Sequence, residues 1–131
     1  MNLRTLCLAI AFSPLAVGLS EAHHSHANYE PDEITELTGT VVDHQWVNPH
    51  TWIYVEVVNE DGESELWALE SGSTGQLIQQ GWTQESIAPG DVITAHVKRL
   101  RDGTNGGLLG LVELPDGTSV CNPGFLCPNE E

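Results

Sequence analysis

Hydrophobic and polar positions alternate with the period of β-strands along most of the chain. The clearest run is Thr51–Val58, which is rich in β-branched and aromatic residues and lies between two turn-forming segments. The strands that the pattern predicts lie at 35–46, 51–58, 65–69, 92–100 and 108–114, with a short extra strand at 118–120. Turns such as Asn59–Gly62 and Ala88–Asp91 separate them. The pattern therefore predicts an all-β domain.

The period changes once, between the third and the fourth predicted strand. Ser71 or Ser73 can cap a short helix that carries Leu77 and ends at Gly81. Three strands, a helix and two strands (β-β-β-α-β-β) is the order of an OB-fold barrel. We expect a small OB-like, five-stranded barrel over residues 35–120, and an open sandwich or meander of the same strands is the alternative.

The first 22 residues are typical of a signal peptide. The positive segment Met1–Arg4 precedes an apolar stretch from Leu6 to Leu19, and Ser20 and Ala22 are small residues at the positions that a signal peptidase requires. The apolar stretch is too short and too interrupted to span a bilayer comfortably. We expect a periplasmic protein without a stable membrane anchor after cleavage, and an uncleaved anchor is the alternative.

The charge of the chain limits its partners. With 4 basic and 19 acidic residues the formal net charge is −15. A polyanion would be repelled, so nucleic-acid binding is excluded. Metal cations, small polar molecules or a basic periplasmic protein partner remain compatible with this charge.

Export also determines how the cysteines are interpreted. Cys7 would leave with the signal peptide, whereas Cys121 and Cys127 remain in the acidic tail at 121–131. An even pair in an oxidising compartment predicts a local disulfide. A metal site is the alternative, although two thiolates are too few for a closed zinc site.

The histidines are the strongest chemical signal. The polar, His-rich segment 23–34 is predicted to be an extended arm, and it carries His23, His24 and His26. If cleavage follows Ala22, the α-amine and the imidazole of His23 can chelate one ion, and a further histidine would complete a histidine brace. Copper favours such a nitrogen-rich site, and zinc is the second choice. The alternative is a terminus that is merely solvated.

A second pair of histidines flanks the first predicted turn. If this hairpin is centred on Val47, His44 lies opposite His50, with Cβ atoms roughly 4.5–5.5 Å apart. Both rings would then contribute to one metal site. The alternative is a structural role, in which the His50 ring bonds a carbonyl of the turn. His96 stands alone in a predicted strand, where a structural role is favoured.

Aromatic residues allow a second kind of site. The chain has four tryptophans, which either fill the core of a small barrel or shape a ligand cleft: Trp46, Trp52, Trp67 and Trp82. The sequence contains no serine-hydrolase elbow, phosphate loop or nucleotide fingerprint. Whether the protein is an enzyme is left open.

Several segments together resemble a family of small exported bacterial proteins of unknown function. They are 22–25 (Ala-His-His-Ser), 39–41 (Gly-Thr-Val), 46–53 (Trp-Val-Asn-Pro-His-Thr-Trp-Ile), 81–82 (Gly-Trp) and 89–91 (Pro-Gly-Asp). The resemblance covers about residues 22–120 and implies an exported β-rich domain with no established activity. It carries over His23, His24 and His50, whereas His26, His44 and the cysteine tail are not part of the family pattern.

Three functions are compatible with these features. The first is a periplasmic protein that binds copper, or less readily zinc, through its N-terminal histidine for carriage or storage. The alternative is an OB-like module that binds a small ligand or a protein without metal, through a face that includes Trp46, Trp52 and Tyr54. The third is a copper-dependent oxidoreductase, for which the sequence names no substrate.

Overall fold

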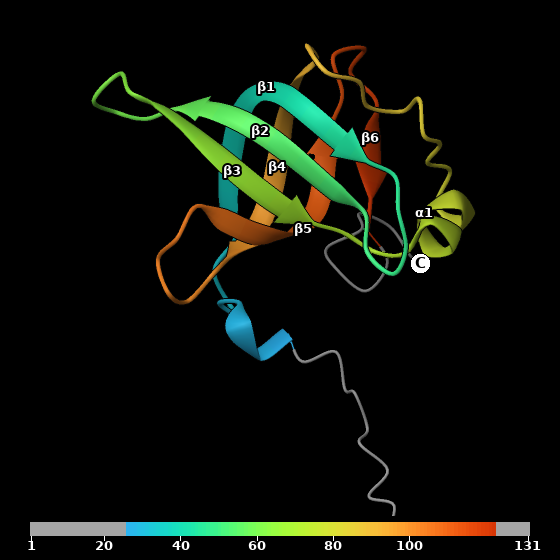
Figure 1. Cartoon of the computed structure of the whole chain (residues 1–131), viewed down its shortest axis with the longest axis horizontal. Coiled ribbons are helices and arrows are strands. Elements are labelled where there is room, and N and C mark those ends of the chain that lie inside the picture. The colour runs from blue at the N-terminus through green and yellow to red at the C-terminus, as the bar shows by residue number, and fades with distance from the viewer. Residues whose placement is uncertain (1–25, 123–131) are drawn as a thin grey trace, which may run out of the picture.

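A computed structural model of the chain describes residues 26–122 (Figure 1). In this range the elements are η1 (His26–Asn28), β1 (Thr35–Gln45), β2 (Trp52–Val58), β3 (Ser64–Glu70), α1 (Thr74–Gln79), β4 (Val92–Arg99), β5 (Gly106–Glu113) and β6 (Ser119–Cys121). The order of strands and helix is the one predicted, including the short strand at the end. None of the helices in the described range is long and apolar enough to cross a membrane.

The strands close into a barrel. Their order in the sheet is β3-β2-β1-β4-β5-β6, and an additional parallel pairing joins β3 to β5. The ring β1-β2-β3-β5-β4 is therefore complete, as in an OB-like barrel, and β6 extends β5 at the edge. The predicted fold class is confirmed, and the alternative of an open sheet is wrong.

Strand β5 begins earlier than the pattern predicts, because its first residues close the barrel. Gly106 and Gly107 pair with Ala68 and Leu69 of β3. A Cβ atom at Gly107 would lie 2.9 Å from the carbonyl oxygen of Lys98, so a larger side chain would not fit this close approach. A segment that the sequence marks as a turn is therefore part of the barrel wall.

The helix begins and ends where its flanking residues predict. Of the two candidate caps, Ser73 is the N-cap, and it forms a capping box with Gln76. Gly81 has a φ of 87° and lies just after the helix. Leu77 is the residue that α1 buries in the core.

The tryptophans were predicted either to fill the core or to shape a ligand cleft, and two of them lie in the core. Trp67 and Trp82 are buried members of the core, whereas Trp46 packs against it only in part. Trp52 lies on the outer side of β2 and is half-buried. The remaining core side chains are Leu37, Val41, Ile53, Val55, Leu69, Leu77, Ile87, Ile93, Ala95, Val97, Leu109 and Val112.

The register of the first hairpin differs from the prediction. His44 pairs with Ile53 and Gln45 with Trp52, and the register shifts between Val41 and Asp43. The prediction that His44 lies opposite His50 is therefore wrong. The physical reason is that residues 46–51 form a loop bonded to the α1 region rather than a tight turn, so His50 is not part of the β1–β2 ladder.

Candidate functional site

The loop 46–51 is held against the start of α1. Asn48 Oδ1 accepts hydrogen bonds from Thr74 N at 3.1 Å and from Thr74 Oγ1 at 3.0 Å. At the other end of the loop, Thr51 N donates to the Gly72 carbonyl at 3.0 Å, and Ser71 N donates to the Thr51 carbonyl at 2.8 Å. These bonds set His50 beside the end of β3.

His50 meets Glu70 there. The Nδ1 atom of His50 pairs with Glu70 Oε1, and the two side chains are 31% and 17% exposed. Glu70 is the last residue of β3, and its direct neighbour on β2 is Trp52. The pair is therefore largely sheltered but open to solvent at the His50 ring.

Tyr29 completes the group from the N-terminal segment. Its hydroxyl donates a hydrogen bond to Glu70 Oε2, the second oxygen of the carboxylate. Burial, and then the hydrogen bond and the charge of Glu70, raise the pKa of Tyr29 well above its usual value. Tyr29 therefore stays a neutral donor, and Glu70 bridges two side chains that lie far apart in the sequence. We call these residues the Tyr29–Glu70–His50 cluster.

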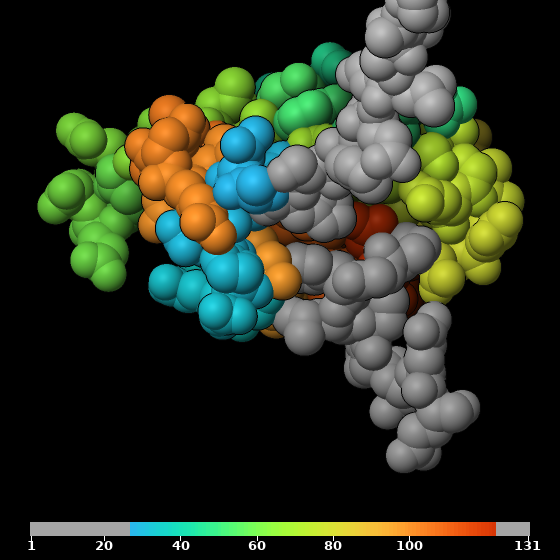
Figure 2. Space-filling view, turned by 90° about the horizontal axis from the view of Figure 1, so that it is seen from below, coloured from blue at the N-terminus to red at the C-terminus, as the bar shows by residue number. Residues whose placement is uncertain are grey.

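Backbone hydrogen bonds fix the segment that carries Tyr29. Tyr29 forms an isolated β-bridge with Leu100. Glu30 N donates to the Arg99 carbonyl at 2.8 Å, and Arg101 N donates to the Asn28 carbonyl at 2.9 Å. In Figure 2 this segment, drawn in blue, lies directly against the orange β4–β5 turn. The end of the predicted arm is thus attached to the barrel.

His44 has a different environment. Its Nδ1 lies 3.0 Å from the Ile87 carbonyl, which can only accept, so Nδ1 is the donor. The ring stands edge-on to Trp46 at 5.7 Å, and Nε2 is buried without a hydrogen-bond partner among the described residues. His44 is thus not brought together with His50.

The structure describes only some of the other predicted ligand residues. His23 and His24 lie outside the described residues, and the side chain of His26 does so as well. Within 26–122, no group of three or more His, Cys, Asp or Glu side chains is placed to hold a metal ion. His96 Nε2 lies 3.1 Å from Glu113 Oε1 on the surface, in line with a structural role. The partner proposed for Cys121, Cys127, is also outside the described range, so their disulfide stays a prediction.

Sequence reasoning missed Tyr29 and Glu70. A signal for Glu70 existed, because it directly follows the third predicted strand, 65–69, and that strand forms a hairpin with the strand that follows His50. An acidic residue at that position is a natural partner for a histidine at the start of the neighbouring strand. No local pattern marks Tyr29, because its contact spans 41 positions.

Comparison with known protein families gives a match. The model of a family of unknown function, DUF6152, matches residues 14–110. No curated protein and no solved structure matches the chain. Because the family model covers most of its length, the chain belongs to the DUF6152 family.

Proposed function

We propose that this member of the DUF6152 family is a periplasmic metal-binding protein that carries or stores copper and that binds zinc more weakly. The N-terminal amine and ring of His23 supply two nitrogens, and His50 or His24 supplies the third. The observation that carries the proposal is the Tyr29–Glu70–His50 cluster, because it attaches the histidine-rich segment to the barrel beside His50.

The pair of His50 and Glu70 has the chemistry of a metal ligand with its supporting carboxylate. Histidines that bind metals usually give their second ring nitrogen to a carboxylate, which orients the ring and raises its basicity. Here Glu70 holds Nδ1, so Nε2 is the atom that would coordinate the ion. Tyr29 in turn holds the other oxygen of Glu70, which fixes the carboxylate.

The length of the chain allows the N-terminal histidines to reach this point. His23 precedes Tyr29 by six residues and His26 precedes it by three. The three residues of η1 rise only about 2 Å each, and an extended chain spans at most about 3.3–3.6 Å per residue, so the six residues cover up to about 16 Å. Attachment at Tyr29 therefore keeps His23 within reach of the His50 ring. His44 is left out of this ligand set, because its remaining ring nitrogen, Nε2, is buried in the barrel rather than exposed beside His50.

Export and cleavage are part of the same proposal. Cleavage after Ala22 creates the α-amine of His23, and the oxidising periplasm forms the Cys121–Cys127 disulfide. The intact mass of the exported protein should equal that of residues 23–131 less two hydrogens. A mass that includes residues 1–22 would refute the N-terminal chelate.

Copper titration tests the proposal. The exported protein is compared with a variant that has one additional residue before His23, and with His50→Ala and His96→Ala. We expect copper binding at micromolar concentration or below, at least about tenfold weaker for the extended chain and for His50→Ala, and unchanged for His96→Ala. Equal binding by the extended chain would refute the role of the amine, and no binding at micromolar copper would refute metal binding.

A second candidate rests on the outer face of β2. Trp52 and Tyr54 are neighbours on this face and both are half-buried, beside Glu70 and Ala68 of β3. The corresponding face of an OB-fold binds ligands. A non-metal ligand or a basic protein partner would then retain its affinity in the presence of a chelator and lose it in Trp52→Ala.

A further inference from the structure

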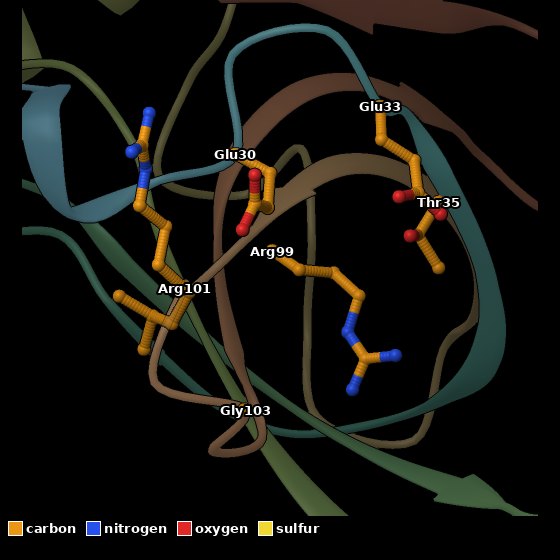
Figure 3. Close-up of a pocket in the computed structure, with 7 residues that line it drawn as sticks. Glu30, Glu33, Thr35, Arg99, Arg101 and Gly103 are labelled. Carbon is orange, nitrogen blue, oxygen red and sulfur yellow. The ribbon is translucent and has the colours of Figure 1, made fainter.

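A pocket of about 280 Å³ lies where the N-terminal segment meets the barrel (Figure 3). It is separate from the Tyr29–Glu70–His50 cluster, and its lining residues are Glu30, Glu33, Thr35, Arg99, Leu100, Arg101 and Gly103. In the close-up, Glu33 and Thr35 stand on one side, Arg101 stands on the other, and Glu30 and Arg99 lie between them. Two segments of the chain, 30–35 and 99–103, therefore form its walls.

The charges around this pocket are unusual for this chain. The net charge is −15, yet all lysine and arginine residues of the described range lie at Lys98, Arg99 and Arg101. Both arginines line the pocket, together with Glu30 and Glu33. The pocket is therefore balanced in charge, with two groups of each sign, on a protein that is otherwise strongly acidic.

These opposite charges do not neutralise one another directly. Among residues 26–122, no ion pair joins Arg99 or Arg101 to Glu30 or Glu33. Arg99 instead packs its guanidinium over the Trp67 ring, 4.9 Å from the ring centre. The charged groups line the same hollow and are held apart from one another.

The walls are also held in place before any ligand binds. Arg101 donates from Nε to the Tyr29 carbonyl at 2.9 Å, and Glu30 N donates to the Arg99 carbonyl at 2.8 Å. Trp67, under Arg99, is a buried part of the core. These contacts position both guanidinium groups and the backbone of Glu30 before a ligand binds, and groups that are already positioned lose little freedom on binding, which favours affinity for a small ligand.

We propose that this pocket binds a small zwitterion with a carboxylate and a primary ammonium group, the chemistry of a free α-amino acid. The carboxylate pairs with a guanidinium, and the ammonium pairs with Glu30 or Glu33. A volume of about 280 Å³ corresponds to roughly nine water molecules at about 30 Å³ each, which suits a ligand of that number of heavy atoms. The lining residues include no aromatic side chain, so a quaternary ammonium group is not the expected cation.

Nuclear magnetic resonance of the ¹⁵N-labelled exported protein, treated with a chelator, tests this site without any metal. The probes are L-glutamine, N-acetyl-L-glutamine, which lacks the ammonium group, and L-glutaminamide, which lacks the carboxylate. We expect L-glutamine to shift the amide signals of residues 30–35 and 99–103, and each blocked probe to bind at least about tenfold more weakly. No shift at about 10 mM L-glutamine, or equal binding of a blocked probe, would overturn the proposal.

Matched variants locate the site. Glu33→Gln and Glu36→Gln remove the same charge from exposed positions, but only Glu33 lines the pocket. Arg99→Met and Lys98→Met form a second pair on β4, of which only Arg99 lines it. We expect weaker L-glutamine binding in the first member of each pair alone. An equal loss in both members would assign the effect to general charge and refute the pocket. Since copper is absent, failure here leaves the proposed metal site unaffected, and failure of the copper titration leaves this pocket unaffected.

Discussion

His44 and His50 are six positions apart in the sequence, yet they lie in opposite chemical environments. His44 lies against the segment that precedes β4, and its ring donates a hydrogen bond to the carbonyl of the buried residue Ile87. His50 lies in a loop, partly open to solvent, and faces a carboxylate. Either a carbonyl or a carboxylate can hold one ring nitrogen of a histidine and prepare the other for an ion or a proton. The other ring nitrogen of His44, Nε2, is buried, whereas the His50 ring is partly exposed, and this difference separates the two roles.

Among the proposed variants, removal of the Glu70 carboxylate is expected to have the largest effect on the difference between the two histidines. Glu70→Gln retains the size of the side chain but removes the charge that orients and polarises His50. We expect copper affinity to fall by about 10- to 100-fold, which is the usual cost of losing such a supporting group. Titration calorimetry with copper measures the change, and Glu113→Gln, beside His96, is the control. Unchanged affinity in Glu70→Gln would remove the main support for His50 as a ligand.

The two histidines should also differ in their effect on folding. His44→Ala leaves the Ile87 carbonyl without its donor and is expected to lower the free energy of unfolding by about 1–3 kcal/mol. His50→Ala removes a partly exposed contact with Glu70 and is expected to cost less than about 1 kcal/mol. Urea denaturation of both variants tests this order. An equal cost, or the reverse order, would show that His50 is the structural histidine of the pair.

The loop that presents His50 can be loosened without touching the ring. Asn48→Ala removes the acceptor of two hydrogen bonds from Thr74 at the start of α1. We expect a loss of about 1 kcal/mol in stability, as for a missing helix cap. Copper affinity should fall by a smaller factor than in Glu70→Gln, because only the position of the loop is affected. Stability measured by denaturation and affinity measured on the same sample distinguish the two effects.

The smallest expected effect concerns pH and Tyr29. Its pKa is raised in the folded protein, first by burial and then by Glu70, so the folded state holds the phenolic proton more tightly than the unfolded chain does. The resulting stabilisation is complete below the unfolded pKa of about 10 and is lost as the pH rises toward the folded value. Wild-type stability should therefore fall above about pH 10, and Tyr29→Phe should remove that part of the decline. Tyr54→Phe is the control that keeps it.

The candidate site could be predicted from the sequence only in part. His50 is marked by its place in the Asn-Pro-His turn, and Asn48 by the same turn. The pairing of His44 with His50 failed because the prediction treated 46–51 as a tight turn. Bonds from this loop to Gly72 and Thr74 make it a longer connection, and those contacts come from a part of the chain about 20 positions away.

The sequence by itself determined the order of the strands, the short helix that ends at Gly81, and the β-rich class, because alternation and capping are local properties of the chain. Only the tertiary structure decided the register of His44 against Ile53, the parallel closure of β3 on β5, and the meeting of Tyr29, Glu70 and His50. Register and closure depend on how distant segments share one core, and several alignments satisfy the same alternation equally well. Packing of the whole barrel selects one of them, and with it the partner of each histidine.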